Sequence, residues 1–582
     1  MKSRQIKLSR RSILILAVSL LSVLLLTLVW SRFRKSPPVT CEEDFDIALI
    51  GGELMDGRGG LAFKADVGIR KGQIACVGII DPTHARKVIS ASGLIVSPGF
   101  IDVHTHVERN VPNSGAFLAG NFVRQGVTTV ITGNCGRSVP DLGKFFKLLA
   151  RNGSEINVAS FVGHNTIRLQ VMRESALAPN DEQLAMMKRL VSAAMHDGAL
   201  GLSTGLEYIP GAYSKTDELV ELAKTARQNG GIYASHIRDE GPNGEAAIRE
   251  AISVGERSGV HIHISHFKAQ GPRQWGSATR RLEIVKAALK KGLNVTLDQY
   301  PYTASSTGLI VLLPLWLSEG GLRKAQQRLR EPSTRKKVRD EMLRDLHALG
   351  WHDYSFARIA YCESDHSLVG LSIPEVALKR AALQPNQTSE RFAGPKLILA
   401  SDDQQADKET ELERQADAVI DVYVHGGAQM VFFNMDEGDV QTIMKTPEVM
   451  FGSDSSVREE NALALPHPRG LGTFPRVLGV YARDKHLFSM EEAIRRMTSL
   501  PADTFGFEDR GQIQPGYWAD VVVFDGTNVI DTATYDRPLG SPEGIRYVLV
   551  NGELVFDQGY LTPALPGMGL RHLNDRAMAP SP

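Results

Sequence analysis

The 582-residue sequence predicts an α/β protein, and three patterns support this fold class. Short apolar segments alternate with amphipathic helical segments over residues 98–456. Several of them begin about 30 residues apart, which is the length of one strand–helix unit. Two shorter stretches with apolar strands and glycine turns flank this region. We therefore expect a parallel α/β domain, a small β domain assembled from two separate stretches, and an amino-terminal transmembrane segment.

The alternating region contains a series of predicted strands. They are Gly99–His104, Val127–Ile131, Val158–Val162, Leu200–Ser203, Ile232–His236, Ile262–His266, Val295–Asp298 and Met450–Asp454. Parallel strands of this number with helices between them close into a TIM-like (β/α)8 barrel, with an open doubly wound sheet as the alternative. The barrel domain spans residues 97–505. Its interval around 307–445 is too long for a simple connection and predicts an insertion.

The flanking stretches, residues 45–96 and 506–562, share one pattern of short apolar strands separated by glycine turns. Each stretch alone would make only a marginal sheet. Pairing the two would bury both, so we expect one small split β-sandwich domain.

Residues 13–30 form an uncharged run between a basic segment, residues 1–12, and a linker, residues 31–44. At about 1.5 Å per residue, a helix of this length nearly crosses a hydrocarbon core of about 30 Å. No A-x-A-like site follows, which favours an uncleaved, single-pass signal anchor over a cleaved signal peptide. Basic residues are denser before the run than after it, so the folded body would lie outside the cytosol, in a periplasm, a lumen or the extracellular space. Residues 563–582, rich in Pro, Gly and Ala, predict a flexible tail.

The composition limits the classes of partner. With 66 Lys+Arg and 66 Asp+Glu the formal net charge is zero, so no nucleic-acid partner is expected. The 42% hydrophobic content is enough for a large core. Four cysteines in a chain of this length exclude a disulfide scaffold.

Histidines stand at the ends of three predicted strands, where barrels of this kind gather their catalytic groups. His104 and His106 end the first strand, and side chains two residues apart in a strand point to the same side. His236 ends the fifth strand and His266 the sixth. A single histidine is more often structural than a ligand, but this arrangement at the strand ends predicts a metal site.

Cys135 and Asp454 complete the set of candidate residues. Cys135 follows the second strand among Gly, Asn and Arg, and its thiolate would suit zinc, which accepts mixed Cys, His and carboxylate ligands. A single Cys is otherwise usually a small buried hydrophobe. Asp454 ends the last strand and is the natural general base, although an Asp there could also cap a helix.

These residues lie in motifs that resemble a known family. The motifs are Pro98–His106, Gly201–Leu206, Ala234–Arg238, Ser265–Lys268, Asp298–Ser306, Gly452–Asp454, His467–Arg469, Gly472–Arg476 and Gly516–Val523. Together they resemble the amidohydrolase superfamily, and within it the D-aminoacylases, or N-acyl-D-amino-acid deacylases. The resemblance covers residues 45–560 and leaves out the membrane segment and the tail.

The resemblance implies two metal positions that share one ligand. A tightly held zinc would bind Cys135, His236 and His266. A second, weakly occupied position would use His104 and His106 together with Cys135.

The resemblance also implies roles toward the substrate, a small-molecule N-acyl-D-amino acid. Asp454 would be the catalytic acid/base, and Lys268 would hold the substrate carboxylate, helped by Tyr208, Tyr300 and Ser306. A compact ammonium beside a metal ligand suits a small carboxylate. For the tyrosines, ordinary packing is the alternative.

Two other functions stay open at this point. A dipeptidase or a hydantoinase-like cyclic-amide hydrolase could use the same fold, but hydantoinase-like members use a carbamylated lysine on the fourth strand. Residues Gly201–Tyr208 contain no lysine, which favours the deacylase. A catalytically inactive, membrane-tethered interaction protein is the third class, and the complete candidate set argues against it. The expected reaction is zinc-assisted hydrolysis of a linear amide, with Asp454 moving the proton.

Overall fold

A computed structural model describes residues 39–382, 402–458 and 463–572. The predicted transmembrane segment at 13–30, its basic flank and most of the linker lie outside these ranges. Within them, no helix combines the length and the apolar character needed to cross a membrane.

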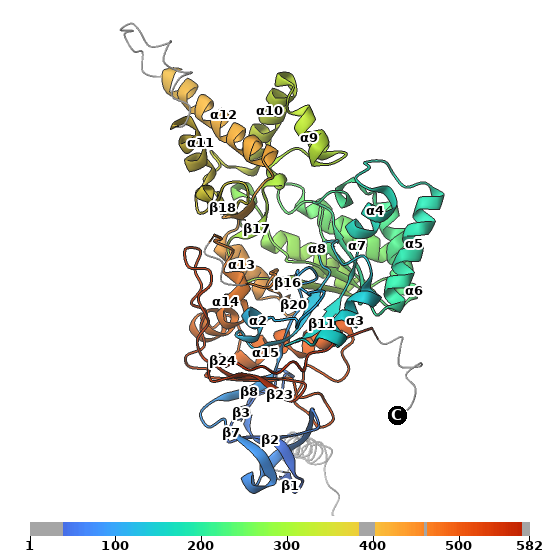
Figure 1. Cartoon of the computed structure of the whole chain (residues 1–582), viewed down its shortest axis with the longest axis vertical. Helices are drawn as coiled ribbons and strands as arrows, with labels where there is room; N and C mark the ends of the chain where they lie inside the picture. The colour runs from blue at the N-terminus through green and yellow to red at the C-terminus, as the bar shows by residue number, and fades with distance from the viewer. Residues whose placement is uncertain (1–38, 383–401, 459–462, 573–582) are drawn as a thin grey trace, which may run out of the picture.

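The middle of the molecule is a closed barrel of parallel strands (Figure 1). In barrel order the strands of the described chain are β9 (Phe100–Asp102), β10 (Val127–Thr132), β11 (Asn157–Ser160) continued by β12 (Val162–Gly163), β13 (Gly201–Gly205), β14 (Ile232–His236), β15 (Ile262–Ile264), β16 (Val295–Gln299) and β20 (Val449–Phe451). Neighbours pair in parallel throughout. Just past β9 and β20, Thr105 bridges Ser455 and closes the ring, which excludes the open doubly wound sheet.

Helices cover the outside of the barrel. They are α2 (Gly120–Val123), α3 (Leu142–Asn152), α4 (His164–Met172), α5 (Asp181–His196), α6 (Thr216–Gln228), α7 (Gly244–Ser258), α8 (Ala278–Lys290), α13 (Glu437–Met444), α14 (Arg469–Arg476), the π-helix Val477–Asp484, α15 (Met490–Met497) and α16 (Ser499–Phe505). The sequence of α5 explains its position. Asn180 and Gln183 form a reciprocal capping box at its start, and Met187, Val191 and Met195 recur every four residues on its buried face.

The insertion between β16 and β20 is a subdomain with a core of its own, at the top of Figure 1. Its elements are β17 (Ser305–Gly308), the short turns η4 (Leu309–Leu312) and η5 (Leu315–Ser318), α9 (Leu322–Arg328), α10 (Pro332–Leu349), β18 (Ala357–Tyr361), η6 (His366–Leu368), α11 (Ile373–Ala382), α12 (Asp402–Val424) and β19 (Gln429–Phe432). The strands form an antiparallel sheet in the order β17–β19–β18. Leu317, Val338, Ile359 and Val419 are fully buried in this core.

The two flanking stretches pack together below the barrel in two sheets (Figure 1). The amino-terminal strands are β1 (Thr40–Cys41), β2 (Phe45–Ile50), β3 (Glu53–Leu54), β4 (Phe63–Lys64), β5 (Asp66–Arg70), β6 (Gln73–Ile80), β7 (Ala85–Ser90) and β8 (Ile95–Pro98), with η1 (Pro82–His84), and the carboxy-terminal ones are β21 (Val521–Phe524), β22 (Ile545–Val550), β23 (Glu553–Asp557) and β24 (Tyr560–Leu561). The sheet orders are β1–β6–β5–β2–β7 and β24–β23–β22–β21–β8–β3–β4. The second sheet joins the two ends of the chain, because β21 pairs with β8. Leu54, Val67, Val521 and Leu549 are buried in the shared core.

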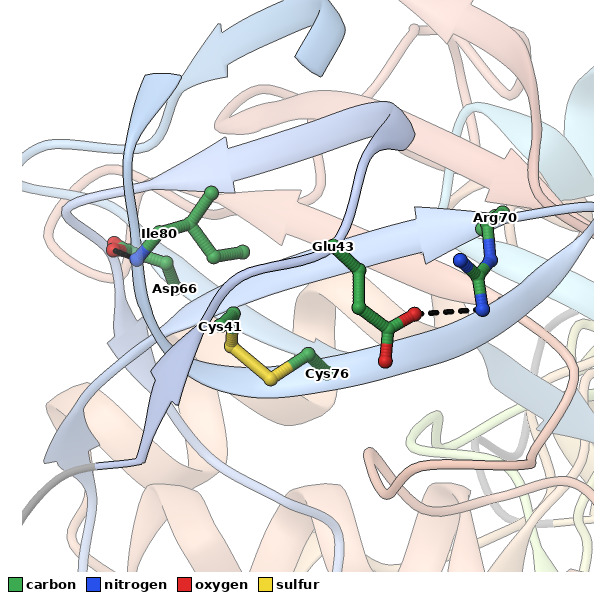
Figure 2. Close-up of a disulfide and its surroundings, with 6 residues drawn as sticks. All are labelled: Cys41, Glu43, Asp66, Arg70, Cys76 and Ile80. Carbon is green, nitrogen blue, oxygen red and sulfur yellow. Dashed lines mark hydrogen bonds and ion pairs between the residues drawn. A yellow bond between two sulfur atoms is a disulfide. The ribbon is translucent and has the colours of Figure 1, made fainter. Parts of the chain in front are cut away.

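A disulfide joins Cys41 of β1 to Cys76 of β6, with 6.1 Å between their Cα atoms (Figure 2). Glu43 forms an ion pair with Arg70 at 2.6 Å, and Ile80 donates its backbone N–H to Asp66. These contacts and the disulfide fix the first strands of the small domain to one another. The sequence excluded a disulfide scaffold and proposed no pair. β1 also lies inside the predicted linker 31–44, so the small domain begins earlier than residue 45.

Removing the disulfide is expected to destabilise this domain. In the double variant Cys41→Ser/Cys76→Ser, the free energy of opening of the small β domain should fall by about 2–4 kcal/mol, because the bridge closes a long loop in the unfolded chain. Hydrogen exchange of β2, β5 and β6 under non-reducing conditions measures this. Reduced wild-type protein should match the variant, and equal protection in the oxidised wild type and the variant would contradict the prediction.

The predicted flexible tail does not begin at residue 563. Residues 563–572 run along β11, where Met568 accepts a hydrogen bond from Val158 and Leu570 donates one back to it, at 2.9 and 2.8 Å. The composition of this segment predicted a loose tail. Its backbone is instead held by hydrogen bonds to β11, a strand far away in the sequence, which composition does not reveal. Residues 573–582 lie outside the described part of the chain.

Candidate metal centre

The Cys135 thiol is the centre of a buried cluster at the carboxyl ends of the barrel strands. Its Sγ is 3.3 Å from His104 Nε2, 3.6 Å from His236 Nδ1 and 3.5 Å from His266 Nε2. The cluster combines residues at or just after the ends of β9, β10, β14 and β15, strands that closure of the barrel brings to one mouth.

Two groups of three side chains share Cys135. Cys135, His236 and His266 form the first, and His104, His106 and Cys135 the second, with the ligand atoms of each group within 4.8 Å of one another. The sequence expected the same two groups. Their N and S donors at these separations fit zinc ligation.

The backbone at the site is unusual. Cys135, His266 and Asp454 have φ values of 50°, 33° and 49°. Non-glycine residues rarely adopt this left-handed conformation, which costs roughly 1–3 kcal/mol and persists only where the surroundings enforce it. The rest of the fold therefore stabilises an unfavourable backbone conformation at these three residues, whose side chains lie at the mouth of the barrel.

Three carboxylates outside the cluster orient its imidazoles. Asp298 lies 3.2 Å from His104 Nδ1, Glu207 lies 2.9 Å from His236 Nε2, and Glu240 lies 3.0 Å from His266 Nδ1. In each ring the other nitrogen faces Cys135 Sγ. Such carboxylate–histidine pairs fix the tautomer and ring orientation of a metal ligand.

Replacing Glu240 by glutamine is expected to weaken Zn²⁺ affinity by about 10- to 100-fold, because His266 loses the carboxylate that fixes its tautomer. Competition with a chromophoric chelator measures the affinity. Glu245→Gln, at an ion pair with Arg280 outside the cavity, is the matched control. Unchanged affinity in Glu240→Gln would show that Glu240 does not position the ring.

The protonation states of the cluster suit a metal ion. Burial and the nearby Lys268 ammonium lower the pKa of His266 to about 3, so its ring is the neutral imidazole that ligation requires. Burial raises the pKa of the Cys135 thiol well above its usual value, and the Asp454 carboxylate adds to this. A bound cation offsets that effect by stabilising the thiolate, so the donor set fits zinc.

Asp454 lies beside the cluster as an ionised carboxylate. Its Oδ1 is 3.0 Å from His106 Nε2, and its Oδ2 is 2.8 Å from Arg469 Nη1. Burial alone would raise the pKa of Asp454, but Arg469 and His106 outweigh it and hold that pKa well below its ordinary value. The group can therefore accept a proton.

A cavity of about 1070 Å³ lies over the cluster, lined by the barrel loops and the insertion. Lys268, Tyr208, Tyr300 and Ser306 all line it, as do Cys135, His236 and Asp454. The structure thus brings every residue predicted to face the substrate to the same cavity as the cluster.

The predicted carboxylate-binding residues have different surroundings. Lys268 Nζ lies 2.5 Å from Glu240 Oε1 and 2.8 Å from His266 Nδ1, so its ammonium is ion-paired with Glu240 beside the metal-ligand ring. Tyr208 Oη accepts a hydrogen bond from Thr307. Ser306 Oγ donates to the backbone oxygen of Met430.

Tyr300 and Arg469 contain buried hydrogen-bond donors that lack a hydrogen-bond acceptor. Within the described part of the chain, no group hydrogen-bonds to Tyr300 Oη, Arg469 Nε or Arg469 Nη1, although Nη1 is ion-paired with Asp454. The Arg469 guanidinium lies over the Tyr300 ring, 4.7 Å from its centroid. Guanidinium and hydroxyl groups are donors that suit a carboxylate.

Sequence reasoning quoted motifs that contain Asp298 and Arg469, but none that contains Glu240, and it gave none of these three residues a role. The signal for Arg469 was its place in His467–Arg469, close after Asp454. Glu240 and Asp298 carry no local signal, since their function depends on histidines elsewhere in the chain.

A metal-ligand cluster and an ionised carboxylate at the mouth of a parallel barrel define a class, the metal-dependent hydrolases of the barrel type. The amidohydrolase family model matches residues 87–556 of this chain. The chain is 34% identical to the D-aminoacylase of Alcaligenes xylosoxydans xylosoxydans over 543 residues, covering 89% of this chain and 96% of that protein. The N-acyl-D-glutamate deacylase of the same organism is also 34% identical, over 540 residues, covering 89% and 95%.

Solved structures agree with these relatives. The N-acyl-D-glutamate deacylase from Bordetella bronchiseptica, complexed with zinc and a phosphonate inhibitor, superposes with a TM-score of 0.73 at 33% identity, covering 91% of this chain and 100% of that one. A D-aminoacylase described as having a binuclear metal centre gives 0.72 at 32% identity, with the same coverage. The chain therefore belongs to the amidohydrolase family and, within it, to the D-aminoacylases. A D-hydantoinase at 15% identity and a TM-score of 0.51 shares the fold alone.

Proposed function

We propose that this protein is a zinc-dependent hydrolase that cleaves the amide bond of N-acyl-D-amino acids and releases a carboxylate and a free D-amino acid. The observation that carries the proposal is the position of Cys135 between the two histidine groups. The relatives named above support the substrate class.

Zinc, when bound, supplies a Lewis acid that polarises the scissile carbonyl and makes water a better nucleophile. Asp454 takes the proton of the attacking water on its carboxylate and returns it to the departing nitrogen. The ion pair with Arg469 and the contact with His106 hold Asp454 in place for both transfers.

The substrate α-carboxylate fits beside the cationic side chains of Arg469 and Lys268 and the Tyr300 hydroxyl, which line the same cavity. With the carboxylate and the scissile amide held at two points, the two configurations of the α-carbon place the side chain on opposite sides of the line that joins them. Only one configuration at that carbon then directs the side chain into open space, so selectivity between D and L forms follows from geometry.

Cyclic-amide hydrolysis is not favoured, because residues Gly201–Tyr208, which comprise β13 and the start of the loop after it, contain no lysine to bridge two metals. The test is a panel of N-acetyl-D-amino acids, their L-enantiomers, dipeptides and hydantoins, assayed with protein reconstituted with zinc. We expect turnover of the D-forms and little of the others. Preferential hydrolysis of a hydantoin or of an L-dipeptide would overturn the proposal.

We further propose that residues 13–30 anchor the protein in a membrane and that its folded body lies outside the cytosol. The charge pattern around this apolar run supports the orientation. The Cys41–Cys76 disulfide supports the compartment, since such bonds persist in oxidising environments and are rare in the cytosol.

Fractionation with thiol labelling tests this localisation. We expect the protein in the membrane fraction, accessible to protease from outside the cytosol, with Cys41 and Cys76 alkylated only after reduction. Recovery in the cytosolic fraction with both thiols free would contradict it.

A further inference from the structure

The connection between β21 and β22, residues 525–544, belongs to the small β domain but packs against the barrel. We call it the small-domain loop. Its first half lies along the π-helix, where Arg483 donates to the backbone oxygen of Val529 at 2.7 Å. Ile530 and Glu543 exchange backbone hydrogen bonds of 3.2 and 3.0 Å, which close the loop on itself. The small-domain loop is therefore a fixed part of the fold, although it contains neither a strand nor a helix.

Asp531 of the small-domain loop is a buried carboxylate, with 4% of its side chain exposed. Its Oδ2 lies 3.1 Å from Arg476 Nη1 and accepts a hydrogen bond of 3.4 Å from Tyr302 Oη. A Cβ on Gly472 would lie 2.3 Å from Tyr302 Oη and 3.0 Å from Asp531 Cβ, so the absence of a side chain there allows α14 to lie this close. The carboxylate is thus held between α14 and the segment that follows β16.

Arg476 connects Asp531 to the segment that carries Tyr300. Its Nε donates to the backbone oxygen of Pro301 at 2.8 Å, and its guanidinium lies over the Tyr302 ring, 4.9 Å from the centroid. The backbone N–H of Tyr302 donates to the backbone oxygen of Tyr300 at 3.0 Å. These contacts fix the backbone on both sides of Pro301. The direction of the Tyr300 side chain, which lines the cavity, depends on that backbone.

His467 connects the small-domain loop to Arg469. Its Nε2 donates to the backbone oxygen of Ala304 at 2.9 Å, and its Nδ1 accepts the backbone N–H of Arg469 at 3.0 Å. The rings of Tyr302 and Tyr535 lie edge-on to this imidazole, with centroids 5.1 and 5.2 Å away. The two tyrosines therefore hold the ring in the orientation that makes both hydrogen bonds, and the ring fixes the backbone of Arg469.

Tyr535 also contacts the insertion. Its ring lies 4.8 Å from the ring of Phe433 and packs against Ala360 of β18 and Val431 of β19. The small domain, the barrel and the insertion thus meet at this one side chain.

We propose that Asp531 and Tyr535 are positioning residues of the deacylase site, through which the small β domain fixes the groups that bind the substrate carboxylate. Neither side chain lines the cavity, so both act through the residues that they contact. This proposal rests on the proposed deacylase function. It gives the small domain a part in substrate binding in addition to its place in the fold.

Asp531→Asn provides the first test, because it keeps the shape of the side chain and removes the ion pair with Arg476. We expect KM for an N-acetyl-D-amino acid to rise about tenfold or more while kcat falls less than about threefold, since the lost interaction holds the carboxylate in the ground state and the transition state alike. Zinc content should not change.

Asp536→Asn is the matched control for Asp531→Asn. Asp536 lies in the same loop, but its side chain is 82% exposed and pairs with Arg358 of the insertion. Both kinetic constants should stay at the wild-type values in this variant. A wild-type KM in Asp531→Asn, or an equal rise of KM in both variants, would overturn the role of Asp531.

A double-mutant cycle shows whether Asp531 acts through Arg476. Arg476→Gln should raise KM by a similar factor, and the double variant Asp531→Asn/Arg476→Gln should be no worse than the more affected single variant. The double variant removes both charges, so it folds even where a single variant with one uncompensated buried charge does not. Effects on KM that multiply would show that the two residues act independently and would contradict the proposal.

Two substitutions of Tyr535 test the contact with His467. Tyr535→Leu removes the aromatic ring and should raise KM, whereas Tyr535→Phe retains the ring and should restore the wild-type KM. Equal KM values in the wild type and in Tyr535→Leu would exclude a positioning role for Tyr535. A rise in Tyr535→Phe as large as in Tyr535→Leu would exclude ring packing as its cause.

Hydrogen exchange separates this inference from the proposed function, because it needs no turnover. Amides of residues 302–306 and 469–472 should exchange at least about tenfold faster in Asp531→Asn and Tyr535→Leu than in the wild type or in Asp536→Asn. Faster exchange supports the positioning role even if no N-acyl-D-amino acid is hydrolysed, an outcome that overturns the deacylase function alone. Exchange at the wild-type rate in both variants overturns the positioning role, whatever the activity.

Discussion

Alanine in place of Cys135 is expected to abolish tight zinc binding and to lower kcat/KM for an N-acyl-D-amino acid by about 10³-fold or more. The thiolate is the one donor shared by both ligand groups, so its loss leaves each of them with two histidines. Two neutral imidazoles bind zinc weakly, and without the metal the scissile carbonyl is not polarised. Metal analysis of the purified protein and steady-state kinetics with and without added zinc measure the two effects.

Cys362→Ala is the matched control for this experiment. Cys362 is also a buried free thiol, but it lies in the insertion core, so its loss should leave the zinc content and the turnover unchanged. Full zinc occupancy and full activity in Cys135→Ala would remove the basis of the proposed function. Loss of activity with zinc fully retained would instead assign Cys135 a role other than ligation.

The barrel was predictable because each of its units is local. A strand of Val and Ile, a polar end and a capped amphipathic helix recur along the chain, and each pattern depends on residues close in sequence. β14 (Ile232–His236) has the predicted bounds. Closure of the ring depends on the contact between Thr105 and Ser455, which no local pattern reveals.

The disulfide and the hydrogen-bonded segment 563–572 show where such reasoning fails. The distance between Cys41 and Cys76 is set by the pairing of β1 with β6, a short parallel contact that composition does not encode. Residues 563–572 have a composition typical of a loose tail, yet their backbone hydrogen-bonds to β11. In both cases the deciding interaction lies in another part of the chain.

Some residues of the candidate site could be predicted from the sequence, and others could not. The histidines and Cys135 could be found because metal ligands are restricted to few residue types and barrels place them at strand ends. Glu240 could not, because acidic residues are common and this one is distinguished only by its contacts with His266 and Lys268. Its ion pair also changes the prediction for Lys268, whose charge is partly neutralised before any substrate binds.

Asparagine in place of Asp454 is expected to lower kcat by about 10²- to 10⁴-fold while zinc remains bound. The amide keeps the size of the side chain and an oxygen near His106, but it cannot take a proton from water or return it to the leaving nitrogen. Asp454 is held ionised by Arg469, so the wild-type base is present at neutral pH. Zinc content, kcat and KM are measured on the same preparation.

Asp454→Asn also leaves the buried Arg469 guanidinium without its carboxylate partner. The effect of this lost ion pair must be separated from the effect of the lost proton transfer. A free guanidinium should hold the substrate α-carboxylate at least as tightly as before, so KM should stay level or fall while kcat collapses. Asp536→Asn, at an exposed ion pair with Arg358, is the control for a charge lost elsewhere. If KM rises strongly while kcat is preserved, Asp454 acts only by holding Arg469 in place. If zinc is lost as well, it acts as a metal ligand, and the proton transfer must be assigned to another group.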